Sequence, residues 1–164
     1  MENNNLQNWE KAKSTFSGEC FQLGPYYRNA ARHDLKHIGF TLSRYKFACK
    51  MLMYRKGLSI CELGCQEALG ALMFQQNTDL KRYVGIDFDA EAIRWSQENL
   101  TGPFEFIEAD FFDSMPDEKF DAIVSLDVIE HIQSQREDEY CRMITSHLKD
   151  SENSCGGGSH YRDS

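Results

Sequence analysis

The sequence lacks any apolar run close to the ~20 residues that a membrane-spanning helix needs, and its first residues, MENNNLQNWEKAK, resemble no secretory signal. We therefore expect no membrane partner and a cytoplasmic location. Six cysteines are scattered along the chain without a complete set of metal-ligand spacings. Cys61 and Cys65 could form half of a metal site, but no Cys/His pair completes it, so we expect reduced thiols and no metal.

The sequence also lacks an excess of positive charge: 18 basic side chains face 26 acidic ones, for a net charge of −8. This balance argues against a nucleic-acid partner. The charge is unevenly spread, because residues 1–56 carry 10 Lys/Arg and only 4 Asp/Glu. This basic segment either recognises an acidic substrate or complements the acidic remainder of the chain, and we favour the second interpretation.

The length of 164 residues fits one domain, and an apolar content of 41% suffices for a core. We divide the chain into an N-terminal helical segment (1–56), a sheet-forming region (57–150) and a disordered tail (151–164), which contains three consecutive glycines. Within the first segment, helical spacing of apolar residues predicts a helix over 41–56. Arg55 and Lys56 would lie in its last turn, and Gly57 would stop it.

From Gly57 onward, short apolar runs alternate with segments of helical character. We predict strands at 58–63, 82–87, 104–109 and 120–126, and helices at 68–76, 90–100 and 133–148, with Asp89 capping the second of these helices. Strands that alternate with helices indicate an α/β fold with a doubly wound parallel sheet.

Acidic side chains stand at or just after the end of each predicted strand, where ligands bind in open α/β sheets. Glu62 and Asp87 are one strand–helix–strand unit apart, so Asp87 can accept both hydroxyls of a ribose. Gly64 permits close backbone approach in the first turn. Asp110 can accept from an exocyclic adenine amine, and Phe88 or Phe111 can supply an apolar face for the ring.

Four segments in order, ELGCxxxxG, GIDFD, EADFFD and FDAIVSLDVIEH, resemble the successive motifs of the class I S-adenosylmethionine-dependent methyltransferases, over about residues 58–132. The preceding TLSRYKFACKML is similar to a helix found in small bacterial members. The resemblance implies a Rossmann-like fold, S-adenosylmethionine as cofactor and methyl transfer to a small-molecule acceptor. It assigns cofactor contacts to Glu62, Gly64, Cys65, Asp87, Phe88, Asp110, Phe111 and Leu126.

These assignments carry specific roles. Glu62 would meet the methionine amino group, Asp87 the ribose, and Asp110 the adenine amine, with Phe88 beside the adenine. Leu126 would lie in the strand-end loop that faces the methionine portion. Phe111 is either an adenine contact or a core residue.

The sequence departs from the family pattern in two places. Gln66 and Ala68 stand where glycine is common, and a left-handed backbone at position 66 would cost about 1 kcal/mol. In addition, about four of the seven family strands are present, which makes the predicted sheet incomplete.

Two further residues have alternative interpretations. His131 is either a general base toward the acceptor or a structural residue of its loop. Arg44, on the predicted helix, either reaches the cofactor carboxylate or is a solvated charge.

Three functions therefore remain open: a methyltransferase, a non-catalytic chain that binds cofactor weakly or acts through a protein partner, and a nicotinamide-dependent oxidoreductase. The third is disfavoured because GCQEALG does not supply the G-x-G-x-x-G fingerprint. We also expect self-association through the fourth strand, since FDAIVSL is apolar at five of its seven positions and has no Lys, Arg or Pro.

Overall fold

The computed structural model describes residues 4–15 and 22–150. Its four strands, β1 (Leu58–Leu63), β2 (Leu80–Asp87), β3 (Phe104–Glu108) and β4 (Ala122–Ser125), form one parallel sheet in the order β3-β2-β1-β4. The first and fourth strands are neighbours, so strand order reverses between β1 and β4. This arrangement confirms the predicted α/β class and the incomplete parallel sheet. The predicted disordered tail, 151–164, lies outside the described residues.

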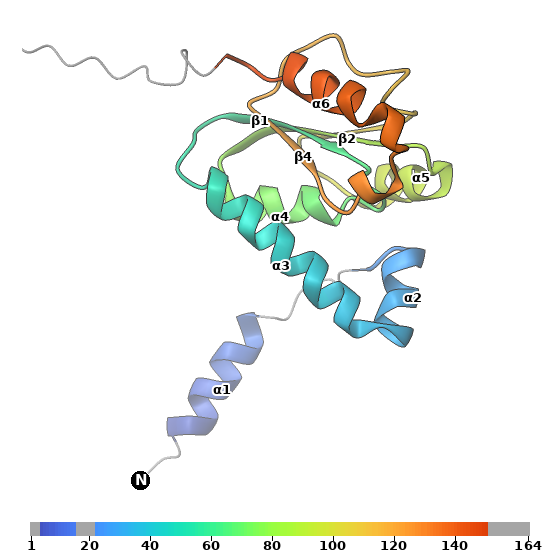
Figure 1. The fold of residues 1–164 in the computed structure, drawn as a ribbon. Helices are drawn as coiled ribbons and strands as arrows, with labels where there is room; N and C mark the ends of the chain where they lie inside the picture. The colour runs from blue at the N-terminus through green and yellow to red at the C-terminus, as the bar shows by residue number, and fades with distance from the viewer. Residues whose placement is uncertain (1–3, 16–21, 151–164) are drawn as a thin grey trace, which may run out of the picture.

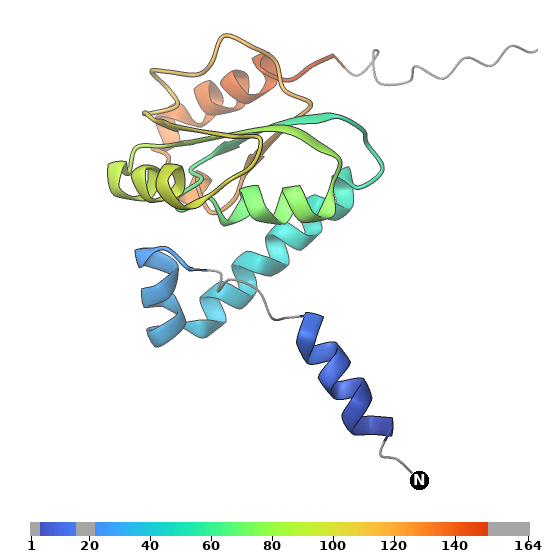
Figure 2. The ribbon, with the colours of Figure 1, turned by 180° about the vertical axis from the view of Figure 1, so that it is seen from behind.

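Helices cover both faces of the sheet. The helices that the structure describes are α1 (Asn4–Thr15), α2 (Pro25–His33), α3 (Leu35–Leu52), α4 (Leu69–Asn77), α5 (Ala90–Asn99) and α6 (Glu137–Ser146), with two short 3-10 turns, η1 (Ile129–His131) and η2 (Ser134–Arg136). Helix α1 lies away from the sheet (Figure 1). Helices α3 and α4 lie on one side of the sheet and α6 on the other (Figure 1). The reverse view shows α5 on the same side as α4 (Figure 2). None of the helices within the described ranges has the length and apolar character to cross a membrane.

The alternation of side chains along β1 divides the core into two layers. Leu58 and Ile60 pack in the cluster that includes residues of α3, α4 and α5, whereas Cys61 and Leu63 pack in the cluster that includes Tyr140 of α6. These four of the six β1 residues are at most 1% exposed. A strand buried on both faces explains why 58–63 reads as a continuous apolar run.

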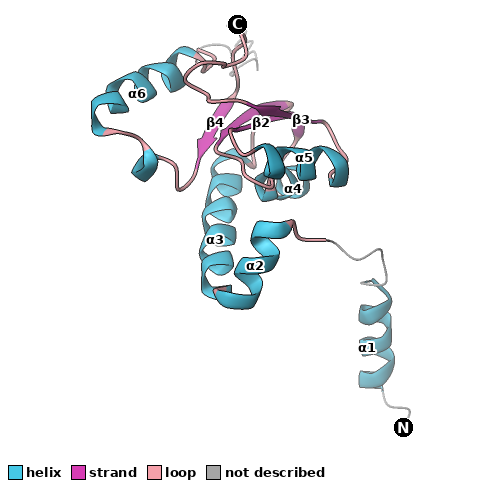
Figure 3. Ribbon diagram, turned by 90° about the vertical axis from the view of Figure 1, so that its right-hand side faces the viewer, coloured by secondary structure: helices cyan, strands magenta, loops and turns pink. Residues whose placement is uncertain are grey.

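The N-terminal segment differs from its prediction. Helix α3 begins at Leu35, where the Asp34 side chain accepts from the His37 N–H (3.2 Å), and it ends at Leu52 rather than at residue 56. The prediction that Arg55 and Lys56 form its last turn and that Gly57 stops it is therefore wrong. Arg55 instead leaves the helix and donates to the carbonyl of Asp121 (2.9 Å). Helix α2 runs beside α3, beneath the sheet (Figure 3).

Other boundaries shift by a few residues. Strand β4 covers 122–125 rather than 120–126, because only these residues pair with β1 residues 60–63. The helix predicted at 133–148 is the turn η2 followed by α6. The predicted cap is confirmed, since the Asp89 carboxylate accepts from the N–H groups of Glu91 (3.0 Å) and Ala92 (3.2 Å).

Candidate functional site

A cavity of about 690 Å³ opens at the carboxyl ends of the strands, between the sheet and helices α2 and α3. Its lining includes most of the residues predicted from the sequence: Arg44, Gly64, Asp87, Phe88, Asp110, Phe111, Leu126 and His131. Glu62 and Cys65 are not among its lining residues. The topology thus brings together residues of helix α3 and of the carboxyl ends of all four strands, at the place where open α/β sheets bind ligands.

The turn after β1 forms the floor of this cavity and has an unusual backbone. Gly64 (φ +69°), Gln66 (φ +52°) and Ala68 (φ +50°) all lie in the left-handed region. The N–H groups of Gly64 and Cys65 both donate to the carbonyl of Ile86, at 2.8 and 3.2 Å, which fixes the turn to the end of β2. Gln66 therefore has the left-handed backbone whose cost the sequence analysis considered. It costs about 1 kcal/mol at each non-glycine position.

Asp87 is a carboxylate of the cavity that two backbone N–H groups hold in place. It ends β2, is 7% exposed, and accepts from the N–H of Gln66 through Oδ2 (2.8 Å) and from the N–H of Asp89 through Oδ1 (2.9 Å). An ionised carboxylate offers about four lone-pair sites, so each oxygen can still accept one more donor. The side chain is thus held rigidly and can accept two further hydroxyl groups.

An apolar surface lies next to Asp87. Phe88 follows it directly and is 79% exposed, although phenylalanine is usually buried. Asp110 lies at the end of β3, and its Oδ1 accepts from the N–H of Phe112 (2.9 Å). Phe111 is buried and packs against Phe112, with ring centroids 5.0 Å apart, while it also lines the cavity. The chain therefore presents an exposed ring and an acceptor carboxylate to the same space.

Glu62 lies in the core rather than on the cavity wall. Its carboxylate is 1% exposed and accepts from the hydroxyl of Tyr45 on α3 (2.6 Å) and from the hydroxyl of Tyr83 on β2 (2.5 Å). Burial raises the pKa of Glu62 to about 7, and the two hydroxyl donors oppose that rise. Its predicted contact with a methionine amino group stays a prediction. In this structure the side chain links α3 to the central strands.

Cys65 also packs in the core, with its side chain completely buried. Burial raises the pKa of the Cys65 thiol well above its usual range. Cys61, the other member of the spaced pair, packs in the opposite core layer. Among residues 4–15 and 22–150, no group of three His, Cys, Asp or Glu side chains is placed to hold a metal ion.

A contact that the sequence did not indicate fixes helix α2 over the cavity. The carboxylate of Glu67, in the turn after β1, accepts from the N–H groups of Tyr26 (2.6 Å) and Tyr27 (3.1 Å) in the first turn of α2. Glu67 is 3% exposed, and burial raises its pKa. A carboxylate at a helix N-terminus is electrostatically favourable. The one sequence signal for the start of α2 was Pro25, since proline is typical of the first position of a helix.

Helices α2 and α3 supply the opposite wall of the cavity through Tyr26, Tyr27, His37, Phe40 and Thr41. The Tyr26 hydroxyl and His37 Nε2 are hydrogen-bonded at 3.0 Å. Sequence reasoning assigned none of these residues to the site, because they precede the recognised motifs and nothing in their spacing points to a strand end.

An ion pair crosses the mouth between α3 and the loop after β4. Arg44 Nη1 lies 2.9 Å from Asp127 Oδ2, and both side chains are partly exposed. Asp127 has a left-handed backbone (φ +57°), which aspartate tolerates better than most residues. His131, in η1, lines the cavity on the same side. The predicted contact of Arg44 with a cofactor carboxylate remains a prediction, and the residue already binds one carboxylate here.

Comparisons with known proteins agree with this geometry. A family model described as "Methyltransferase domain" matches residues 61–151. The cyclopropane-fatty-acyl-phospholipid synthase of Escherichia coli (strain K12) is 27% identical over 107 residues, which cover 65% of this chain and 28% of that protein. The chain therefore spans less than a third of this curated relative.

Two solved structures show the same fold. One is a mycolic acid cyclopropane synthase complexed with SAH and CTAB (TM-score 0.57, 20% identity, covering 66% of this chain and 39% of that one). Another is an S-adenosylmethionine-dependent methyltransferase from Thiobacillus denitrificans in complex with S-adenosyl-L-homocysteine (TM-score 0.55, 14% identity, 65% and 44%).

Proposed function

The chain belongs to the methyltransferase-domain family, and from this premise we propose that it binds S-adenosylmethionine and transfers its methyl group to a small-molecule acceptor. The observation that carries the proposal is Asp87, a buried carboxylate at the carboxyl end of β2. Two backbone N–H groups hold it, and it faces a cavity beside the exposed ring of Phe88.

The residues of the cavity suit this cofactor. The free acceptor sites of Asp87 match a ribose diol, and Phe88 offers an apolar face for a purine ring. Gly64 has no side chain, so the backbone itself lines the cavity floor at this position. A side chain there would lie 2.5 Å from the Val128 side chain, so the turn has no room for one. In this proposal Asp110, which lines the cavity, accepts from the adenine amine, and Arg44 exchanges Asp127 for the cofactor carboxylate.

When bound, S-adenosylmethionine supplies an electrophilic methyl carbon on a sulfonium centre. The acceptor's nucleophilic O, N or C atom would form a bond to this carbon as the carbon–sulfur bond breaks, and the electron pair of that bond would stay on sulfur. The chain's contribution is to orient the acceptor and exclude water, which can supply much of the rate. His131 is our candidate for the base that takes the proton from the methyl acceptor, because it lines the cavity.

The proposal includes a cytoplasmic location, which rests on unpaired thiols. Cys49, Cys61, Cys65 and Cys141 are all free in the described part of the chain. The alternative of a non-catalytic chain that binds cofactor weakly is not favoured by the family match.

Calorimetric titration with S-adenosylhomocysteine, alongside NAD, tests the proposal. We expect binding of the first compound only. Asp87→Asn, which keeps one acceptor oxygen for the backbone, should weaken binding by ~1–3 kcal/mol, the scale for hydrogen bonds to a charged group. Asp87→Ala should weaken it at least as much, since it removes the acceptor of both N–H groups.

Asp117→Asn is the matched control, because Asp117 is exposed and does not line the cavity. Binding of NAD in place of S-adenosylhomocysteine would contradict the proposal. An unchanged titration for both Asp87 variants would remove that residue from the site.

A further inference from the structure

Helix α2 is capped at its N-terminus by a residue from a distant turn rather than by one of its own. Gly24 stands at the N-cap position and has no side chain that could accept from the first N–H groups of the helix. Glu67, in the turn after β1, takes this role and accepts from the N–H groups of Tyr26 (2.6 Å) and Tyr27 (3.1 Å). These are the second and third helical positions, where an N-cap side chain ordinarily acts. The start of α2 is thus attached to the turn after β1.

This contact is close enough to require glycine at position 24. A Cβ atom there would lie 2.1–2.5 Å from the carboxyl group of Glu67. The backbone of Gly24 (φ −65°, ψ 172°) is extended and would suit any residue, so the requirement comes from the carboxylate and not from the backbone. Glu67 itself is buried. A carboxylate enclosed in this way on both the helix and the turn side indicates a specific cap rather than a surface contact.

The same turn holds the carboxylate that we assign to the ribose. Glu67 directly follows Gln66, whose N–H donates to Asp87 Oδ2 (2.8 Å). Gln66 and Ala68, on either side of Glu67, both have left-handed backbones (φ +52° and +50°). The turn therefore directs one N–H group to Asp87 and the next side chain to α2. Because the two contacts belong to adjacent residues, a movement of the turn that changes one must change the other.

Helix α2 carries part of the cavity wall. Tyr26 and Tyr27, which we call the tyrosine wall, both line the cavity, and the Tyr26 hydroxyl is hydrogen-bonded to Nε2 of His37 (3.0 Å), which lines it too. None of these three residues is among those that the proposed function assigns to the cofactor. The tyrosine wall is therefore left for the methyl acceptor.

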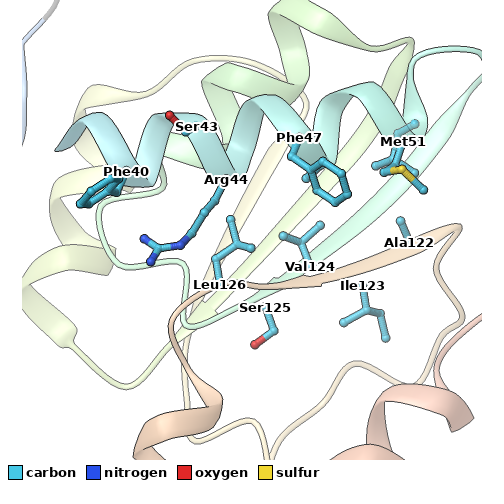
Figure 4. Close-up of a pocket in the computed structure, with 12 residues that line it drawn as sticks. Phe40, Ser43, Arg44, Phe47, Met51, Ala122, Ile123, Val124, Ser125 and Leu126 are labelled. Carbon is cyan, nitrogen blue, oxygen red and sulfur yellow. The ribbon is translucent and has the colours of Figure 1, made fainter. Parts of the chain in front are cut away.

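The wall supplied by α3 is attached in a different way. Figure 4 shows Phe40 and Arg44 on the flank of α3 that faces Leu126, and all three residues line the cavity. Farther along α3, the Tyr45 hydroxyl donates to the carboxylate of Glu62 in the central strand (2.6 Å). Helix α3 thus has its own attachment to the sheet, and the Glu67 cap acts on the tyrosine wall.

We propose that Glu67 is a positioning residue that couples the two sides of the cavity. Cofactor bound at Asp87 restrains the turn after β1, strengthens the cap on α2 and so fixes the tyrosine wall that meets the acceptor. This inference rests on the proposed function, because it takes the Asp87 side of the cavity as the cofactor site. Coupling between two sites is reciprocal, so loss of the cap must weaken cofactor binding by about the same factor.

Hydrogen exchange with and without saturating S-adenosylhomocysteine tests the coupling. In the wild type, the compound should slow exchange at the Tyr26 and Tyr27 amides by roughly fivefold or more, the lower end of typical coupling between sites. Glu67→Gln should abolish this response, because a donor replaces one acceptor oxygen. Gly24→Ala should abolish it as well, because the added methyl group displaces the carboxylate. A merely structural role for Glu67 would instead speed exchange by the same factor with and without the compound.

Calorimetry supplies the reciprocal measurement. Both variants should bind S-adenosylhomocysteine roughly fivefold or more weakly than the wild type. The double variant should be no weaker than either single one, because all three remove the same contact. Gly39→Ala is the matched control, a substitution of the same kind in α3, where a Cβ atom would have no atom of another part of the chain within 4 Å. It should leave both measurements unchanged, and circular dichroism checks that every variant is folded.

Two outcomes overturn the inference alone. One is a wild type that binds S-adenosylhomocysteine without slower exchange at the Tyr26 and Tyr27 amides. The other is slower exchange that survives in both variants, which would show that the compound itself protects α2. A wild type that fails to bind S-adenosylhomocysteine overturns the proposed function, and the inference falls with it.

Discussion

The buried carboxylate of Glu62 should make the stability of this protein depend on pH, and Glu62→Gln isolates that dependence. Burial raises the folded-state pKa of Glu62 from 4.5 to about 7. The unfolded chain therefore releases this proton near pH 4.5, whereas the folded chain keeps it until about pH 7. The folded state binds more protons within this window, so the free energy of unfolding falls as pH rises through it.

The magnitude follows from the size of the shift. A difference of about 2.5 pKa units corresponds to about 3 kcal/mol, at 1.36 kcal/mol per unit. The contribution is fully present below pH 4.5 and is lost by about pH 7. Glutamine is neutral and nearly isosteric, so Glu62→Gln has no such loss. The stability of the variant relative to the wild type should therefore rise by about 3 kcal/mol between pH 4.5 and pH 7, then level off.

Urea denaturation followed by circular dichroism, at half-unit steps of pH from 4 to 8, measures this difference. Subtracting the two curves removes the titration of every other group. Tyr45→Phe is a useful companion, because the Tyr45 hydroxyl donates to Glu62 and lowers its pKa. That variant should lose more stability toward pH 8 than the wild type does. A flat difference between Glu62→Gln and the wild type would refute the reasoning and mean that the carboxylate is ionised, or hydrated, in the folded chain.

Two further predictions concern the turn after β1. Gln66→Gly combined with Ala68→Gly should raise the free energy of unfolding, by at most about 1 kcal/mol per position, because glycine relieves left-handed strain that the turn already carries without cofactor; urea denaturation showing equal or lower stability would mean that the native turn is not strained. Glu67→Gln should accelerate hydrogen exchange at the amides of Tyr26 and Tyr27 by roughly tenfold, the effect of losing about 1.4 kcal/mol of hydrogen bonding, since one oxygen is replaced by a donor that cannot accept them. Unchanged exchange would show that other contacts hold α2 in place.

The sequence by itself determined the elements that depend on local pattern. Continuous apolar runs located the strands, since a strand covered on both faces must be apolar throughout. Asp89 indicated the start of α5, because a capping carboxylate acts on N–H groups two and three residues away. The order of the strand-end residues located Asp87, Phe88 and Asp110 at one edge of the sheet, since the carboxyl ends of parallel strands meet there.

Local pattern was less reliable where a boundary depended on distant contacts. Residues 53–56 have helical composition, yet Arg55 bonds to the loop before β4 and the helix ends at Leu52. Strand β4 is shorter than its apolar run because its pairing with β1 sets its length. In both cases a tertiary contact overrode the propensity of the segment.

Only the tertiary structure decided which side chains share an environment. Glu62, which was expected at the ligand, is buried in the core and accepts from the hydroxyls of Tyr45 and Tyr83, which lie 17 and 21 positions away. Glu67 accepts from the N–H groups of Tyr26 and Tyr27, which lie 41 and 40 positions away, and so holds α2 over the cavity. Hydrogen bonds and burial are short-range, whereas the chain path that brings such residues together is set by the packing of all its elements at once. No periodicity within a window of the sequence records that path.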